Sequence, residues 1–254
     1  MNVLVCIKRV PAPGAKINLT EDQQDVDTRH LGFAMSPHEE CAVEEAVRLG
    51  EQHGGTATVL ALGPPTAYEQ IRQAMAFGIQ HGVLVETGHE EWDPQATASA
   101  ISQAIEQLQQ RGEPFDLILF GNESADAANH QVGIRVAHAL DLPVVAGVKG
   151  IELSGRIVRL KREVPDGLEL CELDLPVAAT VKEGINLPRY PSIKGRLRAA
   201  KAEIACIKVP RQEGGLYKLR LKHPPAQEKE ARVLGKGPEA APAVVDVIEE
   251  LGLL

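Results

Sequence analysis

Short apolar runs alternate with helical repeats through the first 150 residues of the chain. Four runs of apolar and β-branched residues predict strands, at residues 3–7, 58–62, 83–86 and 117–120. The first and last are almost wholly apolar, as in strands that are covered on both faces. Because helical segments separate these strands, the pattern predicts right-handed crossovers and a doubly wound, mostly parallel α/β sheet.

The helical segments carry their own start signals. Ser36-Pro37-His38-Glu39 combines a serine N-cap, a proline at the first helical position and a glutamate three residues after the cap. A helix is therefore expected to begin here and to end near Gly54. Apolar residues at helical spacing predict two further helices, over residues 68–77 and 95–110.

The pattern changes after Pro143. Residues 150–160 predict two strands joined at Ser154-Gly155, which adds a β-hairpin to the sheet, and residues 168–173 and 177–181 predict two more strands. From Gly184 onward the helical rhythm stops, and prolines and charges predominate until a helical pattern returns over residues 242–251. We expect an α/β domain over residues 1–201 and an extended C-terminal arm over 202–254 that needs a partner to become ordered.

Composition narrows the class of protein. The chain has 254 residues, 44% of them apolar, and no apolar run approaches the roughly 18 residues of a membrane helix. Its first residues, MNVLVCIKRV, predict a buried strand and not an export signal, so we expect a cytoplasmic protein without direct membrane insertion. Cys6, Cys41, Cys171 and Cys206 are far apart and without a CxxC pair, and we interpret them as reduced core thiols.

Charge is distributed unevenly along the chain. The net charge is −8 and only eight residues are aromatic, which argues against binding nucleic acid. Residues 182–222, in contrast, contain eleven Lys or Arg and only three Glu. This basic segment is either a solvated face or a surface that attracts acidic partners or anionic ligands.

Signatures of catalysis are missing from the sequence: it contains no GxGxxG, GxxxxGK[ST], GxSxG or HExxH. We therefore expect no catalytic residues. A metal site is not expected either, because Asp22, Asp25 and Asp27 lack the glycine and the distal glutamate of a calcium loop.

One arrangement is typical of a ligand site. Residues 121–133 leave the carboxyl end of a predicted buried strand and enter a helix, which is where open parallel sheets bind ligands. Gly121 permits close approach to the backbone, and the free N–H groups of a loop and a helix start attract phosphate. Residues 36–39 are expected to face the same pocket, and the alternative is an ordinary strand-to-helix loop.

Taken as a set, several blocks resemble the electron-transfer flavoprotein β-subunit family. Residues 3–10, 35–49 and 71–78 are similar to the family's opening strand, first helix and a third block. The two most specific matches are the loop at residues 121–133 and the segment at 186–193, which resembles the family's Asn-x-Pro-Arg-Tyr signature. Their order and spacing cover nearly the whole chain.

The resemblance implies an electron-carrier subunit on a sheet of the adenine-nucleotide-binding type. This subunit would carry AMP, and a partner α subunit would hold the redox-active FAD. Electrons would pass from acyl-CoA or related dehydrogenases toward a quinone-reducing oxidoreductase. The family's AMP contacts fall on Cys6, Ser36, Pro37, His38, Glu39, Leu62, Gly121, Asn122, Glu123, Ser124, Ala125, Asp126, Ala127, Ala128, Asn129, His130, Gln131 and Val132.

The family's recognition loop falls on the basic segment, within residues 184–201. The resemblance places an apolar anchor at Ile193 among cationic residues that would steer the chain toward an acidic partner. The residues implied in partner docking are Pro188, Arg189, Tyr190, Ile193, Lys194, Arg196 and Arg198.

Two departures from the family pattern bear on the nucleotide. Val132 stands where many members have threonine, so any phosphate contact at this position is through the backbone. Electron-bifurcating relatives bind a second FAD and show an Asp-Gly-Asp-Thr-Ala-Gln-like loop, whereas residues 126–131 lack its glycine, second aspartate and threonine. We favour AMP, although Val132 resembles the bifurcating form. A stand-alone nucleotide-binding protein of the universal-stress type is the other alternative, and the long C-terminal arm argues against it.

Overall fold

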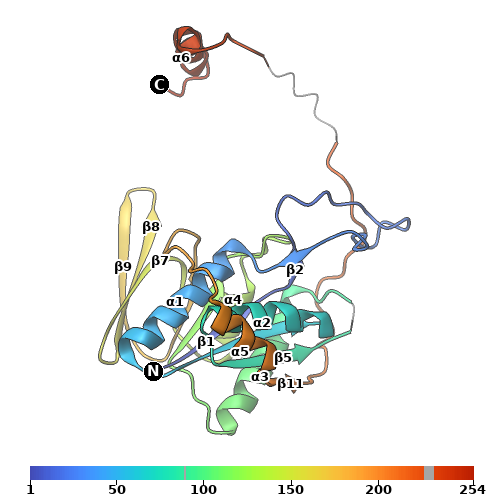
Figure 1. Cartoon of the computed structure of the whole chain (residues 1–254), viewed down its shortest axis with the longest axis vertical. Helices are drawn as coiled ribbons and strands as arrows, with labels where there is room; N and C mark the ends of the chain where they lie inside the picture. The colour runs from blue at the N-terminus through green and yellow to red at the C-terminus, as the bar shows by residue number, and fades with distance from the viewer. Residues whose placement is uncertain (89, 226–231) are drawn as a thin grey trace.

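The computed structural model describes residues 1–88, 90–225 and 232–254 and shows one large sheet with helices on both faces (Figure 1). The strands lie in the order β11-β5-β4-β1-β6-β10-β7-β8-β9, and the first seven of them run parallel. Those seven are β11 (Ile204–Ile207), β5 (His81–Glu86), β4 (Thr56–Gly63), β1 (Asn2–Ile7), β6 (Leu117–Gly121), β10 (Val177–Val181) and β7 (Val144–Ser154). The predicted doubly wound, mostly parallel α/β fold is confirmed.

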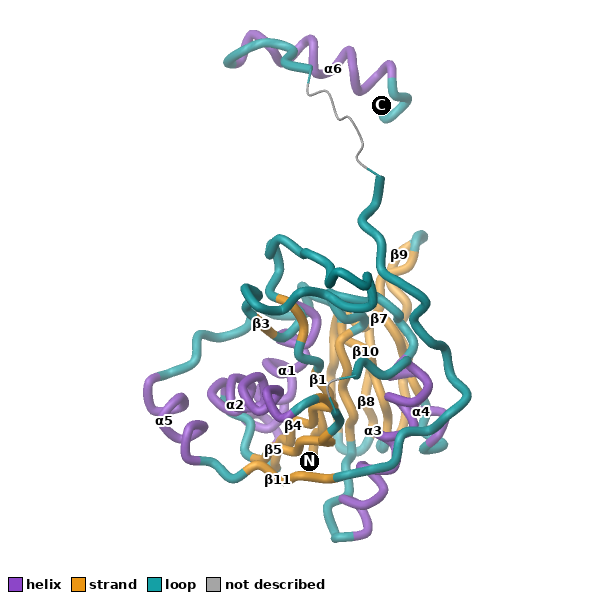
Figure 2. The backbone as a smooth tube through the Cα atoms, turned by 90° about the vertical axis from the view of Figure 1, so that its right-hand side faces the viewer, coloured by secondary structure: helices purple, strands orange, loops and turns teal. Residues whose placement is uncertain are grey.

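Helices cover both faces of this sheet (Figure 2). α1 (Pro37–His53) and α2 (Tyr68–Phe77) pack on one face, and α3 (Pro94–Gln110) and α4 (Val132–Ala139) pack on the other. The apolar run of β1 supplies both cores, because Val3 and Val5 point toward α1 while Leu4 and Cys6 point toward α3. This is why β1 is apolar at every position from Val3 to Ile7.

The start of α1 forms as the sequence predicts. Ser36 is its N-cap, Pro37 is the first helical residue, and a Glu39 carboxylate oxygen accepts a hydrogen bond from the Ser36 N–H at 2.9 Å. The helix ends at His53, one residue before Gly54, whose φ of 70° is favourable for glycine.

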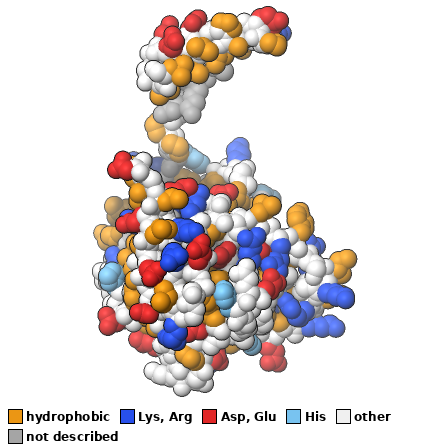
Figure 3. All heavy atoms as spheres, turned by 90° about the vertical axis from the view of Figure 1, so that its left-hand side faces the viewer, with side chains coloured by type: hydrophobic (Ala, Val, Ile, Leu, Met, Phe, Trp, Pro, Cys, Tyr) orange, Lys and Arg blue, Asp and Glu red, His pale blue; other side chains and the backbone are white. Residues whose placement is uncertain are grey.

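The predicted hairpin addition is also present. β7 turns at Gly155, which has a φ of 61°, into the antiparallel β8 (Ile157–Val164), and β9 (Gly167–Asp174) completes the sheet. Figure 3 views the molecule from this side and shows acidic and basic side chains intermixed. Strands β7 to β9 carry the pairs Arg159–Glu172 at 2.7 Å and Lys149–Glu163 at 3.7 Å. A second, two-stranded sheet joins β2 (Val10–Pro11) to β3 (Phe33–Ala34).

The region predicted as an extended recognition loop contains a helix. α5 (Ile193–Lys201) begins after Ser192, whose side-chain oxygen accepts a hydrogen bond from the Gly195 N–H at 3.0 Å. The expectation of a loop over residues 184–201 is therefore wrong for residues 193–201. The prolines of this region all precede Ser192, and good helix formers follow it, so a serine cap suffices to start a helix.

The segment assigned to the C-terminal arm begins with a strand. β11 pairs in parallel with β5 at the edge of the main sheet, so the extended part starts after Ile207 and not at residue 202. Beyond it the chain crosses its own domain, where Lys218 pairs with Asp25 at 2.7 Å and the Leu221 N–H donates to the Gln23 carbonyl at 2.8 Å. Four consecutive apolar residues, Ile-Ala-Cys-Ile, could have predicted this strand from the sequence.

The chain ends in a short helical segment, η2 (Pro238–Ala240) followed by α6 (Ala241–Glu250). No residue of α6 is buried, and Val244, Val245 and Leu251 are exposed. The part of the predicted arm at residues 226–231 lies outside the described residues. None of the helices described has the length and hydropathy that spanning a membrane requires.

Candidate functional site

The two segments that the sequence predicted to face one pocket lie together at the carboxyl edge of the sheet. Residues 122–131 follow β6, which ends at Gly121, and residues 36–39 form the N-cap and first turn of α1. The Ser36 side-chain oxygen accepts a hydrogen bond from the Ala125 N–H at 3.0 Å, which joins the segments directly. Cys6 and Leu62 lie at the same edge, near the ends of β1 and β4.

A glycine is required at position 121, because the end of β6 lies close to the first turn of α1. A β-carbon on it would lie 2.7 Å from Cγ of Glu39 and 3.2 Å from the Glu39 backbone nitrogen. The end of β6 therefore passes the first turn of α1 at a distance that no larger residue permits without a shift.

Glu39 is buried and serves the architecture of the site. Its carboxylate accepts backbone hydrogen bonds from the Lys8 N–H at 2.8 Å and from the Ser36 N–H at 2.9 Å. Burial raises the pKa of Glu39 to about 8, and these hydrogen bonds only partly offset the cost of the buried charge. Burial next to Glu39 also raises the pKa of the Cys6 thiol, which stays protonated at neutral pH.

Glu123 lies between two histidines. His38 Nε2 is 3.3 Å from one carboxylate oxygen of Glu123, and His130 Nε2 is 2.5 Å from the other. His38 Nδ1 accepts a hydrogen bond from the Glu183 N–H at 2.7 Å, so Nε2, which faces Glu123, is the nitrogen that carries the proton. His38 was expected at the start of a helix and among the AMP contacts, but its contact with Glu123 appears only in the fold.

The polar network extends from the loop into the sheet. The Thr180 hydroxyl donates to Asn122 Oδ1 at 2.9 Å and accepts from the Gly147 N–H at 3.0 Å. Asn122 Nδ2 lies 3.2 Å from His130 Nδ1. Strands β6, β7 and β10 thereby fix the base of the loop, while residues 125–130 are exposed at its tip.

Lys8 places a positive charge at the end of β1. Its ammonium pairs with Asp126 at 2.6 Å and with Glu91 at 3.3 Å. Burial lowers the pKa of Lys8, but the two carboxylates outweigh it, so the net shift is upward. Sequence reasoning missed Lys8, although a cation directly after a buried strand of a parallel sheet was a usable signal.

The start of α4 leaves backbone donors without a side-chain cap. Gln131 is the N-cap residue, and its side chain makes no capping hydrogen bond. The first N–H groups of a helix have no intrahelical partner, and together with the helix dipole they attract anions. This end of α4 therefore offers an anion position next to the loop.

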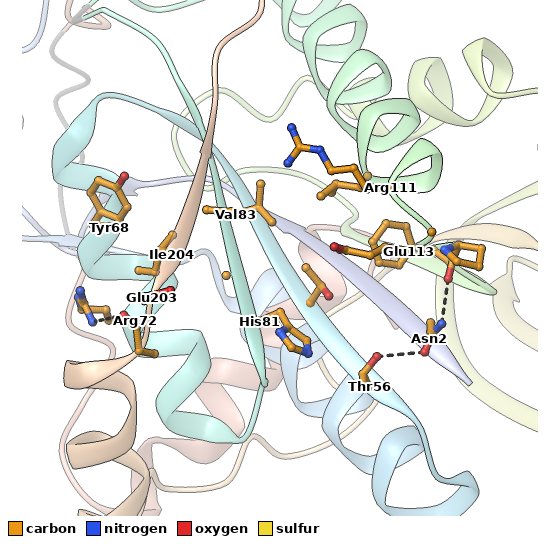
Figure 4. A pocket seen from close by; sticks show the side chains of 18 residues that line it. Asn2, Thr56, Tyr68, Arg72, His81, Val83, Arg111, Glu113, Glu203 and Ile204 are labelled. Atoms are coloured by element: carbon orange, nitrogen blue, oxygen red, sulfur yellow. Dashed lines mark hydrogen bonds between the residues drawn. The ribbon is translucent and has the colours of Figure 1, made fainter.

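A cavity of 890 Å³ lies at the opposite edge of the sheet (Figure 4). It is lined by residues from the amino ends of strands, including Asn2, Thr56, His81 and Ile204. Open parallel sheets bind nucleotides at the carboxyl ends of their strands, so this cavity is not the candidate nucleotide site. Among the described residues, no group of three or more His, Cys, Asp or Glu is arranged to hold a metal ion.

A second candidate surface is formed by α5 and the segment before it. Tyr190 is 92% exposed and Ile193 is 79% exposed, and Lys194 and Arg196 lie exposed beside them. Leu197, at 61% exposure, is one helical turn from Ile193 and so lies on the same face. Leu187 is exposed as well. Sequence reasoning missed Leu187 and Leu197 because it treated this region as a loop.

Two of the residues predicted for docking contact their own domain. Arg189 pairs with Glu44 at 2.8 Å and with Glu51 at 2.6 Å, both on α1. Arg198 Nη2 donates to the Met75 carbonyl at 3.2 Å. The other predicted docking residues, Pro188, Tyr190, Ile193, Lys194 and Arg196, are exposed or half-buried.

Comparison with known proteins assigns the chain to a family. Residues 25–211 match the electron transfer flavoprotein domain. Electron transfer flavoprotein subunit beta of Thermoanaerobacterium thermosaccharolyticum is 33% identical over 229 residues, which cover 89% of this chain and 86% of that protein. The subunit beta of Bacillus subtilis is 33% identical, with 79% and 76% covered. Protein FixA of Sinorhizobium fredii is 32% identical, with 98% and 89% covered.

Proposed function

The chain belongs to the electron transfer flavoprotein family, and we propose that it is the β subunit of a heterodimeric electron carrier that binds AMP and docks dehydrogenases. Membership confirms the resemblance found in the sequence. The observation that carries the proposal is the match over residues 25–211, which spans both the loop after β6 and the docking region. It favours a subunit over a stand-alone nucleotide-binding protein.

The carboxyl edge of the sheet is suited to a nucleoside monophosphate. Because Gly121 has no side chain, a ligand could approach the backbone there closely. The start of α4, which has no side-chain cap, offers N–H donors to a phosphate. Lys8 pairs with Asp126 and so ties the loop after β6 to the end of β1. Ser36 and the residues from Gly121 to Val132 would hold AMP, which adds stability because it binds only the native state.

In this role the subunit carries no catalytic group of its own. FAD in the partner α subunit supplies the redox chemistry, and this chain supports that subunit and presents a docking surface. The surface around Ile193 is apolar and flanked by Lys194 and Arg196, which suits an acidic dehydrogenase with an apolar pocket. We propose acyl-CoA or related dehydrogenases as electron donors, a quinone-reducing oxidoreductase as acceptor, and the cytoplasm as the location.

The C-terminal helix α6 is a candidate contact with the α subunit. Its exposed Val244 and Val245, and Leu251 and Leu254 after it, would be buried by such a partner. Their exposure in the described chain supports a role in assembly.

The test is to purify the heterodimer, denature it and identify the released nucleotides. We expect one AMP and one FAD per heterodimer. Two FAD and no AMP would contradict the proposal and support the bifurcating form, which Val132 resembles. Failure of the chain to co-purify with any flavin-bearing subunit would contradict the heterodimer itself.

A further inference from the structure

The docking helix α5 is tied to α1 just before it begins. The Arg189 guanidinium donates from Nε to Glu44 at 2.8 Å and from Nη1 to Glu51 at 2.6 Å, and its Nη2 donates to both carboxylates. The Arg189 backbone N–H donates a further hydrogen bond to Glu44. The Glu44 side chain is only 2% exposed. Asn186 adds hydrogen bonds to Glu45 at 2.8 Å and to the Cys41 carbonyl at 3.0 Å.

A second arginine holds the other end of the helix. Arg72, on α2, donates from Nη1 to the carbonyls of Ala199 at 2.5 Å, Ala200 at 3.0 Å and Ala202 at 3.3 Å. These carbonyls lie in the last turn of α5 and just after it, where a helix has unpaired acceptors. Between the two ends, Gly195 packs directly against the Ala76 backbone of α2.

These contacts matter because α5 cannot order itself. A helix of nine residues is marginal in isolation, and Ile193 and Leu197 on its outer face are exposed and cannot anchor it. The internal contacts of α5 are therefore what set its direction and hold its apolar face outward.

We infer that Arg189 and Arg72 are positioning residues for docking: they clamp the two ends of α5 and pre-order the apolar surface of Leu187, Tyr190, Ile193 and Leu197. The inference rests on the proposed function of that surface. A surface ordered before encounter loses less conformational entropy on binding, and this benefit appears chiefly in the lifetime of the complex.

The arrangement of charges separates clamping from steering. The Arg189 guanidinium is occupied by two carboxylates of its own domain, so its charge is compensated before a partner arrives. Lys194 and Arg196 have no such compensation among the salt bridges of the described residues and face solvent. Loss of Arg189 should therefore chiefly shorten the lifetime of the complex with the dehydrogenase. Loss of Lys194 and Arg196 should chiefly slow its formation.

The test uses the purified heterodimer carrying Arg189→Met or Arg72→Met. The matched control is Arg48→Met, because Arg48 also pairs with Glu44, at 2.8 Å, but forms no hydrogen bond or salt bridge to residues 184–202 in the described part of the chain. The measurements are Tm, binding kinetics with an acyl-CoA dehydrogenase, steady-state reduction by that dehydrogenase, and amide hydrogen exchange of residues 193–201 without partner.

We expect both clamp variants to raise koff and KM for the dehydrogenase about ten-fold, with kcat unchanged and a smaller change in kon. Exchange in α5 should accelerate in the absence of any partner. Arg189→Lys should recover part of the loss, since an ammonium can pair with one carboxylate but cannot bridge two with a fork. Arg48→Met should lower Tm without changing koff or exchange in α5.

Two results would overturn the inference. The first is that Arg48→Met raises koff as much as Arg189→Met does, at a similar loss of Tm. The second is that both clamp variants leave koff and the amide exchange of α5 unchanged. Failure of the proposed docking function is recognisable separately, because Ile193→Ala would then leave reduction by the dehydrogenase unchanged. Exchange in the free heterodimer would still report whether the clamps order α5.

Discussion

The side-chain oxygen of Ser36 accepts a hydrogen bond from the backbone N–H of Ala125 at 3.0 Å, although 89 residues separate them in the chain. Ser36 is fully buried and also caps α1. One hydroxyl thus joins the first turn of a helix to the loop that the proposed nucleotide would contact, and the fold of this loop depends on the helix start.

Ser36→Ala should therefore lower both stability and nucleotide content. Loss of an N-cap costs about 1 kcal/mol, and the Ala125 N–H also loses its partner. Ser192→Ala is the matched control, because Ser192 caps α5 at 3.0 Å but lies outside the site. Denaturant unfolding and AMP released per heterodimer check the prediction. Equal AMP content in both variants would show that this hydrogen bond does not shape the site.

Gly121→Ala should destabilise the domain by about 1–3 kcal/mol, since its β-carbon would meet Glu39 at 2.7 Å. Gly50→Ala is the control, because Gly50 lies within α1 and a β-carbon there has no neighbour within 4 Å. That substitution should stabilise the domain by about 0.5–1 kcal/mol. Urea titrations of both variants measure the effects. An unchanged free energy of unfolding for Gly121→Ala would mean that α1 shifts freely to make room for the β-carbon.

Glu39 should make stability fall as pH rises. Its pKa is about 8 in the folded chain against an ordinary 4.5, so the folded state binds the extra proton between these values. The stability it contributes is fully present below pH 4.5 and is lost as pH rises through about 8. Unfolding free energies measured from pH 5 to 9 should show this decline, with a slope of at most about 1.4 kcal/mol per pH unit from one group.

Glu39→Gln should flatten that decline, because glutamine does not titrate. A single amide oxygen cannot serve both backbone donors as well as a carboxylate does, so the variant is less stable overall and the slope is the informative quantity. Some slope should remain, since burial also raises the pKa of Glu40 and of Glu45. An unchanged slope would assign the pH dependence to groups other than Glu39.

Ile193→Ala should weaken coupling to an acyl-CoA dehydrogenase by about one to two orders of magnitude, as burial of such a side chain is worth roughly 1.5–3 kcal/mol. Leu170→Ala is the control, because Leu170 is also apolar and exposed, at 58%, but lies on β9. Stopped-flow reduction measures the effect, and flavin absorption and AMP content should stay unchanged. A loss of heterodimer stability that matches the loss of rate would contradict the role of Ile193 as a docking anchor.

A chain that ends at His223 should fold and yet fail to form the heterodimer. This truncation keeps β11 and the Lys218–Asp25 contact but removes α6, whose residues are all unburied. Circular dichroism should be nearly unchanged, while size-exclusion chromatography with the α subunit should show separate proteins. Normal assembly of the truncated chain would assign α6 another purpose. Truncation at residue 201 is less informative, because it also removes an edge strand.

Local signals in the sequence determined the scaffold of this protein. The strand and helix pattern, the Ser36 cap with Glu39, and the turn at Ser154-Gly155 each lie within a few residues of what they specify. Such features depend on backbone geometry and side-chain period, which act over short distances along the chain. The position of the candidate nucleotide loop followed from the same pattern, since the carboxyl ends of parallel strands meet at one edge.

Tertiary structure alone decided which side chains meet. Arg189 was predicted to face a partner but pairs with Glu44, 145 residues away, and His38 meets Glu123 across two elements. The sequence gives the charge of Arg189 but not which carboxylate compensates it, because that depends on where α1 and the chain before α5 cross. The helical state of α5 was decided in the same way: its packing on α2 and the Arg72 bonds to its last carbonyls stabilise a helix too short to persist alone.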